Sequence, residues 1–219
     1  QVDFIVTNFA NGDVIGHTAN TQAKIRCAEA VDKYLKEVVE AASEAGYLIL
    51  ITADHGNLET LYQEDGTPHV SHTTNLVPFI VVDPLITKNS QVYDGKLADI
   101  APTILNALNI PQPAEMTGVN LLTRGGANSV RKVLLIILDG WGNGSSDETN
   151  PIFLANTPYW DHLLTSCVSS QLEAAGSAVG LKAGKAGNSE AGHLNIGAGR
   201  VVLQDDMRLD QAMKDGSFY

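Results

Sequence analysis

The chain is poor in cysteine, in aromatic residues and in long apolar runs. Its two cysteines, Cys27 and Cys167, do not stand in a CxxC or CxxH pattern. This argues against a disulfide framework or a cysteine-rich zinc site and predicts free thiols in a reducing cytoplasm. The longest aliphatic run, residues 133–138, is far too short to cross a bilayer. No charged-then-apolar leader opens the chain, so we expect no secretory signal.

Basic residues are also scarce. The 219 residues include 14 Lys and Arg against 25 Asp and Glu, which gives a net charge of −11. Proteins that bind nucleic acids or anionic membranes need a basic face, so neither partner is expected. We expect a cytoplasmic monomer. An acidic protein that handles an anionic substrate must supply positive charge locally, and bound metal ions are one way to do so.

The apolar pattern predicts one large α/β domain. Strands separated by helices indicate a three-layer fold, with a mainly parallel central sheet covered by helices on both faces. Pro78 indicates a sheet edge or the start of a strand, and the polar segment 123–132 is typical of a linker. The expected buried strands are 3–8, 47–52, 77–82 and 133–138, a further strand lies near 168–174, and the expected helices are 21–45, 97–108 and 158–165.

Three aspartates follow the predicted strands. Asp13 comes shortly after the first strand, Asp54 follows 47–52, and Asp139 directly follows 133–138. The carboxyl ends of parallel strands share one edge of a sheet, so these side chains are expected to converge. Two carboxylates about 4 Å apart repel by about 4 kcal/mol at an effective dielectric constant of 20, so convergence calls for cations. The alternative is that each aspartate only caps a helix or turn.

Histidines cluster with these aspartates. His17 is four residues after Asp13, and His55 directly follows Asp54. Mixed Asp and His ligation suits Mn²⁺, Zn²⁺ or Mg²⁺, and the aspartates favour the harder ions. Five of the six histidines lie in loop-like segments beside Asp, Gly or Ser, namely His17, His55, His69, His72 and His193.

Ser189 is the candidate nucleophile. It lies in a glycine-rich stretch that is expected to open a helix, where backbone N–H groups favour a phosphate. A bound metal would lower the pKa of its hydroxyl. The alternative is a serine that caps the helix, with Gly192 allowing close packing.

Six strings carry a family resemblance: NGDVIGHT (11–18), TADHGN (52–57), HVSHTTN (69–75), DIAPTIL (99–105), LDGWG (138–142) and GNSEAGHLNIGAGR (187–200). They resemble cofactor-independent (2,3-bisphosphoglycerate-independent) phosphoglycerate mutases, which belong to the alkaline phosphatase superfamily. The resemblance covers nearly the whole chain outside 123–132. It implies an alkaline phosphatase-like fold and corresponds to the phosphatase domain of such a mutase.

The resemblance implies two divalent metal sites. Manganese is the preferred ion, with magnesium, zinc and cobalt as alternatives. Ser189 would be phosphorylated during turnover, and Asn188 and His193 would contact the substrate or support the site, while His69 would not be a ligand. Asp13, His17 and His72 would hold one ion, and Asp139, Ser189, Asp54 and His55 would hold the other.

Two departures from the family stand out. Residues 1–122 correspond to the family's C-terminal part and residues 133–219 to its N-terminal part, so the order is inverted around the joint at 123–132. This predicts a circular permutation that forms one phosphatase-type domain. The family's transferase domain, which supplies most of the arginines that grip phosphoglycerate, is absent from the sequence.

For the whole enzyme, the resemblance implies conversion of 3-phosphoglycerate to 2-phosphoglycerate in glycolysis through a phosphoserine. For this chain alone we expect at most a weak phosphomonoesterase. Two alternatives stay open. One is a stand-alone metal-dependent phosphatase or sulfatase-like hydrolase, and the other is a catalytically inert, metal-binding permutant.

Overall fold

The computed structural model describes residues 2–86, 91–122 and 131–217. Most of the predicted joint, residues 123–130, lies outside the described residues. The expected strands and helices are confirmed with bounds within one residue of the observed ones, except that the expected helix 97–108 is a 3-10 turn, 97–99, followed by an α-helix, 100–107. The elements are β1 (Phe4–Phe9), α1 (Asn11–Gly16), α2 (Thr21–Glu44), β2 (Tyr47–Thr52), β3 (Val77–Val82), β4 (Gly95–Lys96), η1 (Leu97–Asp99), α3 (Ile100–Ala107), β5 (Lys132–Leu138), α4 (Pro151–Leu154), α5 (Pro158–Ser166), β6 (Val168–Glu173), η2 (Gly176–Val179), α6 (Ser189–Ala198) and α7 (Asp205–Asp215).

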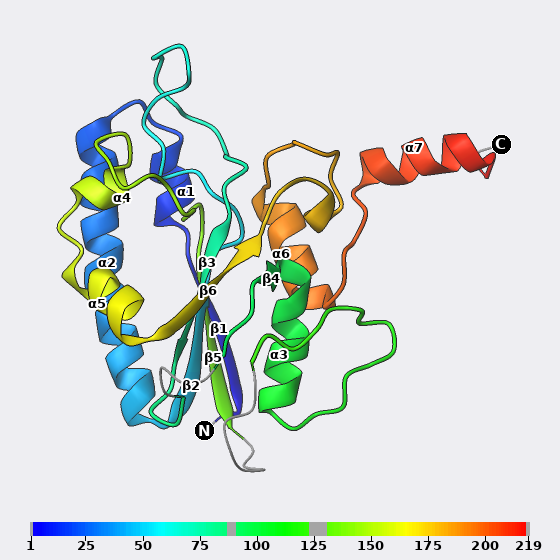
Figure 1. Cartoon of the computed structure of the whole chain (residues 1–219), viewed down its shortest axis with the longest axis horizontal. Coiled ribbons are helices and arrows are strands. Elements are labelled where there is room, and N and C mark those ends of the chain that lie inside the picture. Colours follow the sequence, from blue (N-terminus) through cyan, green and yellow to red (C-terminus); the bar gives the residue numbers. More distant parts are fainter. Residues whose placement is uncertain (1, 87–90, 123–130, 218–219) are drawn as a thin grey trace.

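The described strands form one six-stranded sheet in the order β1-β5-β2-β3-β6-β4. Helices α1, α2, α4 and α5 lie on one side of it, and α3 and α6 lie on the other (Figure 1). β5 pairs in parallel with both β1 and β2, so a strand from the second part of the chain lies between two strands from the first. The expected three-layer α/β architecture is therefore confirmed.

One strand runs against the others. β3 is antiparallel to β2 and to β6, whereas the remaining strands share one direction. β3 is internal, and Pro78 is its second residue, so Pro78 marks the start of a strand and not a sheet edge. Because β3 is reversed, the loop that precedes it lies at the same edge of the sheet as the loops that follow β1, β2 and β5.

The expectation that the first strand is buried was wrong. β1 is an edge strand with β5 as its only neighbour among the described residues. Phe4, Ile5 and Val6 are 42%, 38% and 54% exposed. The residue composition resembles that of a buried strand, but the described helices cover the inner strands instead. The exposure is on both faces, because successive strand residues point to opposite sides.

Helix α2 shows how the layers are joined. The Asn20 side chain accepts a hydrogen bond from the Ala23 amide and caps the first turn, and Gly46 follows the last turn with φ +79°. Its core-facing stripe includes Ala28, Val31 and Leu35. Among the described helices, none combines the length and apolar character required to span a membrane.

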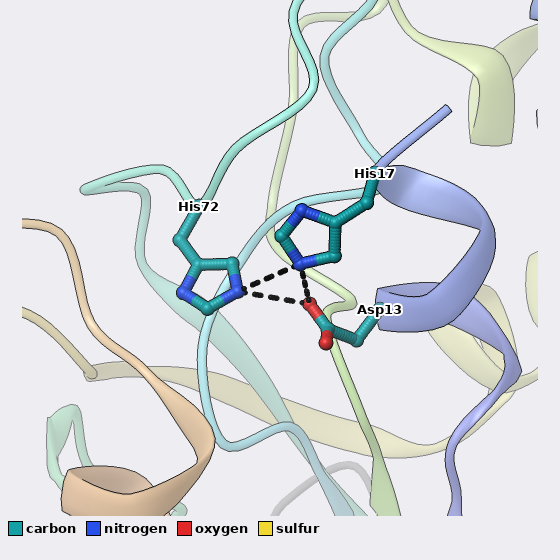
Figure 2. Close-up of side chains that lie close together, drawn as sticks. All are labelled: Asp13, His17 and His72. Atoms are coloured by element: carbon teal, nitrogen blue, oxygen red, sulfur yellow. Dashed lines mark hydrogen bonds and ion pairs between the residues drawn. The ribbon is translucent and has the colours of Figure 1, made fainter. Parts of the chain in front are cut away.

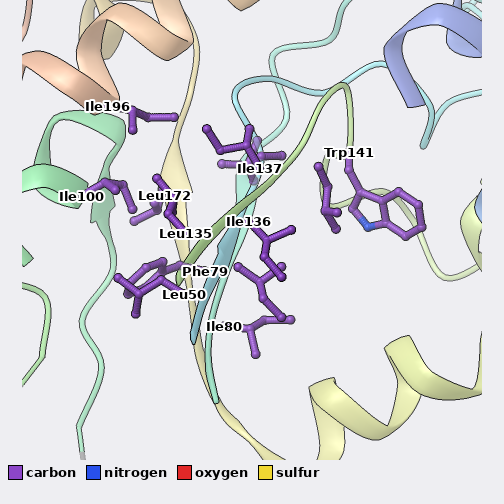
Figure 3. Packing of buried hydrophobic residues seen from close by; sticks show 14 of the residues in the cluster. Leu50, Phe79, Ile80, Ile100, Leu135, Ile136, Ile137, Trp141, Leu172 and Ile196 are labelled. Atoms are coloured by element: carbon purple, nitrogen blue, oxygen red, sulfur yellow. The ribbon is translucent and has the colours of Figure 1, made fainter. Parts of the chain in front are cut away.

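The core lies on both faces of the sheet. Leu50 and Leu135 point toward α3 and α6, whereas Ile80 and Ile136 point to the opposite side (Figure 3). All four side chains are almost completely buried. The strands between the two core layers hold in fixed positions the loops at the edge of the sheet where β1, β2 and β5 end.

We predict that Ile136→Ala lowers the free energy of unfolding by about 2–5 kcal/mol, because it leaves a cavity at a fully buried position. Ile5→Ala makes the same change on the exposed edge strand and should cost less than half as much. Urea unfolding followed by circular dichroism measures both. Equal losses would show that β1 is covered in the folded protein.

Candidate metal centre

The predicted site residues come together at one edge of the sheet. β1 leads into α1, which carries Asp13, and the end of β2 leads to Asp54 and His55. β5 ends directly before Asp139. The loop before the reversed strand β3 brings His72 to the same edge. The convergence of the three carboxylates is therefore confirmed.

Asp13, His17 and His72 form the first group of facing side chains (Figure 2). Asp13 Oδ1 lies 3.3 Å from His17 Nε2 and 3.0 Å from His72 Nε2. The two Nε2 atoms lie 3.2 Å apart. One carboxylate oxygen and two imidazole nitrogens therefore face one small space, which is a geometry that suits a divalent ion.

The second group surrounds His55. Its Nε2 atom lies 3.0 Å from Ser189 Oγ, 3.4 Å from Asp139 Oδ1 and 3.5 Å from Asp54 Oδ2. The Ser189 hydroxyl donates to Asp139 Oδ1 at 3.1 Å. His55 Nε2 is also 3.8 Å from Asp13 Oδ1, so the two groups adjoin.

Backbone carbonyl groups orient the histidines. His17 Nδ1 contacts Val70 O at 2.9 Å, His55 Nδ1 contacts Gly56 O at 3.1 Å, and His72 Nδ1 contacts Gly187 O at 2.8 Å. A carbonyl oxygen can only accept, so each Nδ1 must carry the proton and donate. In a neutral ring, Nε2 then has a free lone pair, as metal-ligating histidines require.

The charges in the site depend on one another. Burial opposes ionisation of Asp13, but hydrogen bonds with His72 and Asn57 outweigh it and hold the pKa of Asp13 well below its ordinary value. Burial likewise opposes protonation of His55, but a hydrogen bond with Asp139 and the charge of Asp54 raise its pKa to about 9. Asp13 is shifted by the donors and imidazole rings around it, whereas His55 is shifted by the carboxylates around it.

One buried atom tests directly whether the site fits a metal ion. Asp54 is fully buried, and its Oδ1 accepts from the His55 and Gly140 amides at 3.0 and 3.2 Å. Its Oδ2 atom makes no hydrogen bond, although His193 Nδ1 and His55 Nε2 lie 3.3 and 3.5 Å from it. A buried carboxylate oxygen without a partner is costly unless a cation satisfies it. Asp54, Asp139 and His193 also form a group close enough to share an ion, so the residues fit divalent metal binding.

Helix α6 presents the candidate nucleophile. Ser189 is its first residue, and Asn188 is the cap, because the Asn188 side chain accepts from the Ala191 amide at 2.8 Å. The alternative in which Ser189 itself caps the helix is therefore wrong. A Cβ atom at Gly192 would overlap Asp54 O and lie 2.8 Å from Asp54 Cβ. Gly192 thus lets α6 approach the end of β2 closely.

His193 also points into the site. Its Nδ1 atom contacts Ser189 O at 2.9 Å and lies 3.3 Å from Asp54 Oδ2. The nearby Asp54 carboxylate raises the pKa of His193. His69, by contrast, belongs to none of the described ligand groups; its carbonyl oxygen accepts from Lys24, and its buried Nδ1 atom has no hydrogen-bond partner.

Sequence reasoning missed three residues that hold the site together. Asn8 Nδ2 donates to Asp139 Oδ2 at 2.9 Å, and Asn57 Nδ2 donates to Asp13 Oδ1 at 2.8 Å. Asn57 stands in the recognised TADHGN string, and Asn8 stands near the end of a predicted strand, so their positions offered a signal.

The third missed residue, Glu59, is buried and connects three loops. Its Oε2 atom accepts from the Asn57 and Gly142 amides at 2.8 and 3.0 Å. Its Oε1 atom accepts from the side chains of Thr73 and Asn75. These loops carry His55, Asp139 and His72. Glu59 therefore fixes the distances between groups that lie far apart in the sequence.

We predict that Glu59→Gln lowers the free energy of unfolding by about 1–3 kcal/mol, because the new amide faces donors that the carboxylate had satisfied. It should also weaken metal binding at both groups. Glu64→Gln, an exposed change in the neighbouring loop, is the matched control. Urea unfolding and titration with Mn²⁺ provide the two measurements, and identical behaviour of the two variants would contradict the connecting role.

Comparison with known proteins agrees with this geometry. The model of the metalloenzyme superfamily matches residues 1–112 and 131–215. Relatives named 2,3-bisphosphoglycerate-independent phosphoglycerate mutase are 49% identical over 125 residues in Moorella thermoacetica and 50% identical over 122 residues in Bacteroides fragilis. These matches cover 57% and 56% of this chain and 24% of each relative.

The resemblance expected from the six strings is thus confirmed, although the matched part spans only about a quarter of these relatives. The family model covers nearly all of the described chain and agrees with the cluster of Asp and His side chains. The chain belongs to the metalloenzyme superfamily and is similar to 2,3-bisphosphoglycerate-independent phosphoglycerate mutases.

Proposed function

We propose that this chain carries out metal-dependent phosphoryl transfer through Ser189. One observation carries the proposal: the Ser189 hydroxyl lies at the start of α6, within 3.1 Å of both His55 Nε2 and Asp139 Oδ1. A hydroxyl at a helix N-terminus beside a candidate metal group is suited to attack a phosphate.

Two divalent ions would be held by the two groups. Asp13, His17 and His72 would hold the first, and Asp54, His55, Asp139 and Ser189 the second. Bound ions would lower the pKa of the hydroxyl and neutralise charge on a phosphoryl group. Manganese fits a set of oxygen and imidazole ligands, and Mg²⁺, Zn²⁺ and Co²⁺ are the alternatives to compare.

The chain's own residues orient the nucleophile. Asp139 Oδ1 accepts the Ser189 hydrogen bond, and the capped first turn of α6 holds the serine backbone. Attack by Ser189 Oγ would form a bond to phosphorus while the ester bond on the opposite side breaks and the alcohol leaves with a proton from solvent; water would then cleave the phosphoserine to release phosphate. The two acceptors nearest to the serine proton are Asp139 Oδ1 and His55 Nε2, and where an ion occupies His55 Nε2 the proton would pass to Asp139 or to solvent. The positive end of α6 favours the anionic group at this position.

A small phosphomonoester such as phosphoglycerate is the proposed substrate, as the names of the relatives suggest. In the described part of the chain, the hydrogen bonds that reach Ser189 and Asp139 come from His, Asn and Ser groups. Lysine and arginine take no part in them, so the site offers little to grip a carboxylate. Weak phosphomonoester hydrolysis is therefore proposed for this chain, and mutase turnover only for an enzyme that supplies those contacts.

We also propose that the chain is a circular permutation that forms one domain from residues 1–122 and 133–219. The insertion of β5 between β1 and β2 supports this, because neither part could form the central sheet alone. The two parts also contribute residues to one site, which supports the formation of a single domain. Asp13, Asp54 and His72 come from the first part, whereas Asp139 and Ser189 come from the second.

We predict that Ser189→Ala abolishes hydrolysis of p-nitrophenyl phosphate by the Mn²⁺-loaded chain and removes phosphoserine from the protein, because no other residue that the structure describes places a hydroxyl within hydrogen-bonding distance of both His55 and Asp139. Ser177→Ala, which changes an exposed serine, is the control. Steady-state rates and intact mass after incubation with substrate give the two readouts.

Equal residual hydrolysis in both variants would favour the inert alternative. Faster cleavage of p-nitrophenyl sulfate than of the phosphate would favour a sulfatase-like hydrolase. Rapid conversion of 3-phosphoglycerate by this chain alone would contradict the predicted weakness of substrate binding.

Metal removal should also destabilise the fold. An ion at about 100 times its dissociation constant adds about 2.7 kcal/mol to the free energy of unfolding, provided the unfolded chain does not bind it. We predict that Mn²⁺ raises the melting temperature of the chelator-treated protein. Asp54→Asn should reduce the gain, and a melting temperature unaffected by every divalent ion would contradict the proposed metal sites.

A further inference from the structure

A lysine is buried on the core-facing stripe of α2. Lys24 is 1% exposed and stands one turn before Ala28, in line with Val31 and Leu35. An apolar residue would be expected at this position, because burying an ammonium group costs several kcal/mol unless it is well paired. The Lys24 side chain therefore calls for an explanation that the proposed chemistry does not provide.

Its ammonium group binds backbone carbonyls and not a carboxylate. Lys24 Nζ donates to Thr60 O at 3.1 Å and to His69 O at 2.7 Å. These two atoms lie at the two ends of the segment 60–69, which the His69 N to Leu61 O hydrogen bond also closes. Burial lowers the pKa of Lys24, and the charge of nearby Glu59 offsets only part of this shift.

The tethered segment leads directly to the first metal group. Val70, the residue after His69, uses its carbonyl oxygen to accept the His17 Nδ1 proton at 2.9 Å. His72 follows two residues later and contacts Asp13. On the other side, Lys24 belongs to the helix that follows α1, which carries Asp13. The Lys24 ammonium group thus joins the chain region that carries Asp13 and His17 to the segment that leads to His72.

We propose that Lys24 is a positioning residue for the group Asp13, His17 and His72, and that it sets the affinity of this group for a divalent ion. The inference rests on the proposed metal sites. Lys24 anchors the His69 backbone, which fixes both the carbonyl that orients His17 and the position of His72.

The second group makes no described hydrogen bond to Lys24 or to residues 60–69, and it adjoins the first group only where His55 Nε2 lies 3.8 Å from Asp13 Oδ1. Asp54 and His55 follow β2, Asp139 follows β5, and Ser189 begins α6. Their described hydrogen bonds involve Gly140, Gly56 and Asn8. Loss of the Lys24 contacts should therefore lower the affinity for the ion at the first group and leave the affinity for the other ion unchanged. A general loss of structure would lower both affinities.

The test compares Lys24→Met with Lys36→Met by calorimetric titration of the full chain with Mn²⁺. Methionine fills a similar volume without donating to the carbonyls, and burial of an apolar side chain at this position is tolerable. Lys36 lies on the same helix, is 54% exposed and pairs only with Glu40 among the described residues. For Lys24→Met we expect one of two ions to bind about 10- to 100-fold more weakly, as for other residues that orient a ligand. For Lys36→Met we expect no change.

A double-mutant comparison assigns the weakened ion. In a His17→Ala background, which already lacks the first group, Lys24→Met should not alter the remaining affinity. In an Asp139→Asn background, Lys24→Met should lower the affinity for the ion that still binds at the first group. If Lys24→Met fails to fold, Lys24→Arg keeps the charge and the donors, and it should bind both ions with nearly the affinities of the unmodified chain.

The outcomes separate the two proposals. If the unmodified chain binds no Mn²⁺, the proposed metal sites fail. If it binds two ions and Lys24→Met also binds both with unchanged affinity, or loses both equally, the positioning role of Lys24 fails while the metal sites stand. Loss of both ions in Lys24→Arg would likewise overturn the role assigned to Lys24.

Discussion

The structure depends on holding several lone-pair atoms closer together than their electrostatic repulsion favours. Asp13 Oδ1 and the Nε2 atoms of His17 and His72 lie within 3.3 Å of one another, and Asp54 Oδ2 is buried without a hydrogen bond. Such an arrangement persists only if the scaffold is rigid or a cation neutralises it. Much of the surrounding polar structure serves this purpose, from the carbonyl groups that orient the imidazole rings to the capped helix that carries Ser189.

Two buried charged residues, Glu59 and Lys24, stabilise different parts of the site. Glu59 receives four hydrogen bonds from three loops and so sets the spacing of the site as a whole. Lys24 donates to two carbonyl groups and acts on one side of the site. Neither residue contacts the reacting atoms. Their placement explains how a site assembled from distant segments is held in one geometry.

Much of the fold and the site could be predicted because the sequence signals were local. The ends of β2 and β5, together with Asp54 and Asp139, follow from apolar runs that stop at an acidic residue. The contribution of His72 depends on the reversed direction of β3, which is a tertiary property that strand periodicity does not encode. The exposure of β1 was mispredicted for the same reason, since composition does not reveal which strand has one neighbour. Lys24 was visible as a charge on an apolar stripe, but its carbonyl partners became evident only from the three-dimensional structure.

The exposed strand β1 has a consequence for association. Its outer edge carries the backbone groups of Phe4–Phe9, and Asn8 in the same strand donates to Asp139. A polypeptide that added a strand there would order the segment that presents Asn8. Docking at the edge and ligand binding at the centre would then be thermodynamically linked, and by reciprocity each event would alter the affinity of the other by the same factor.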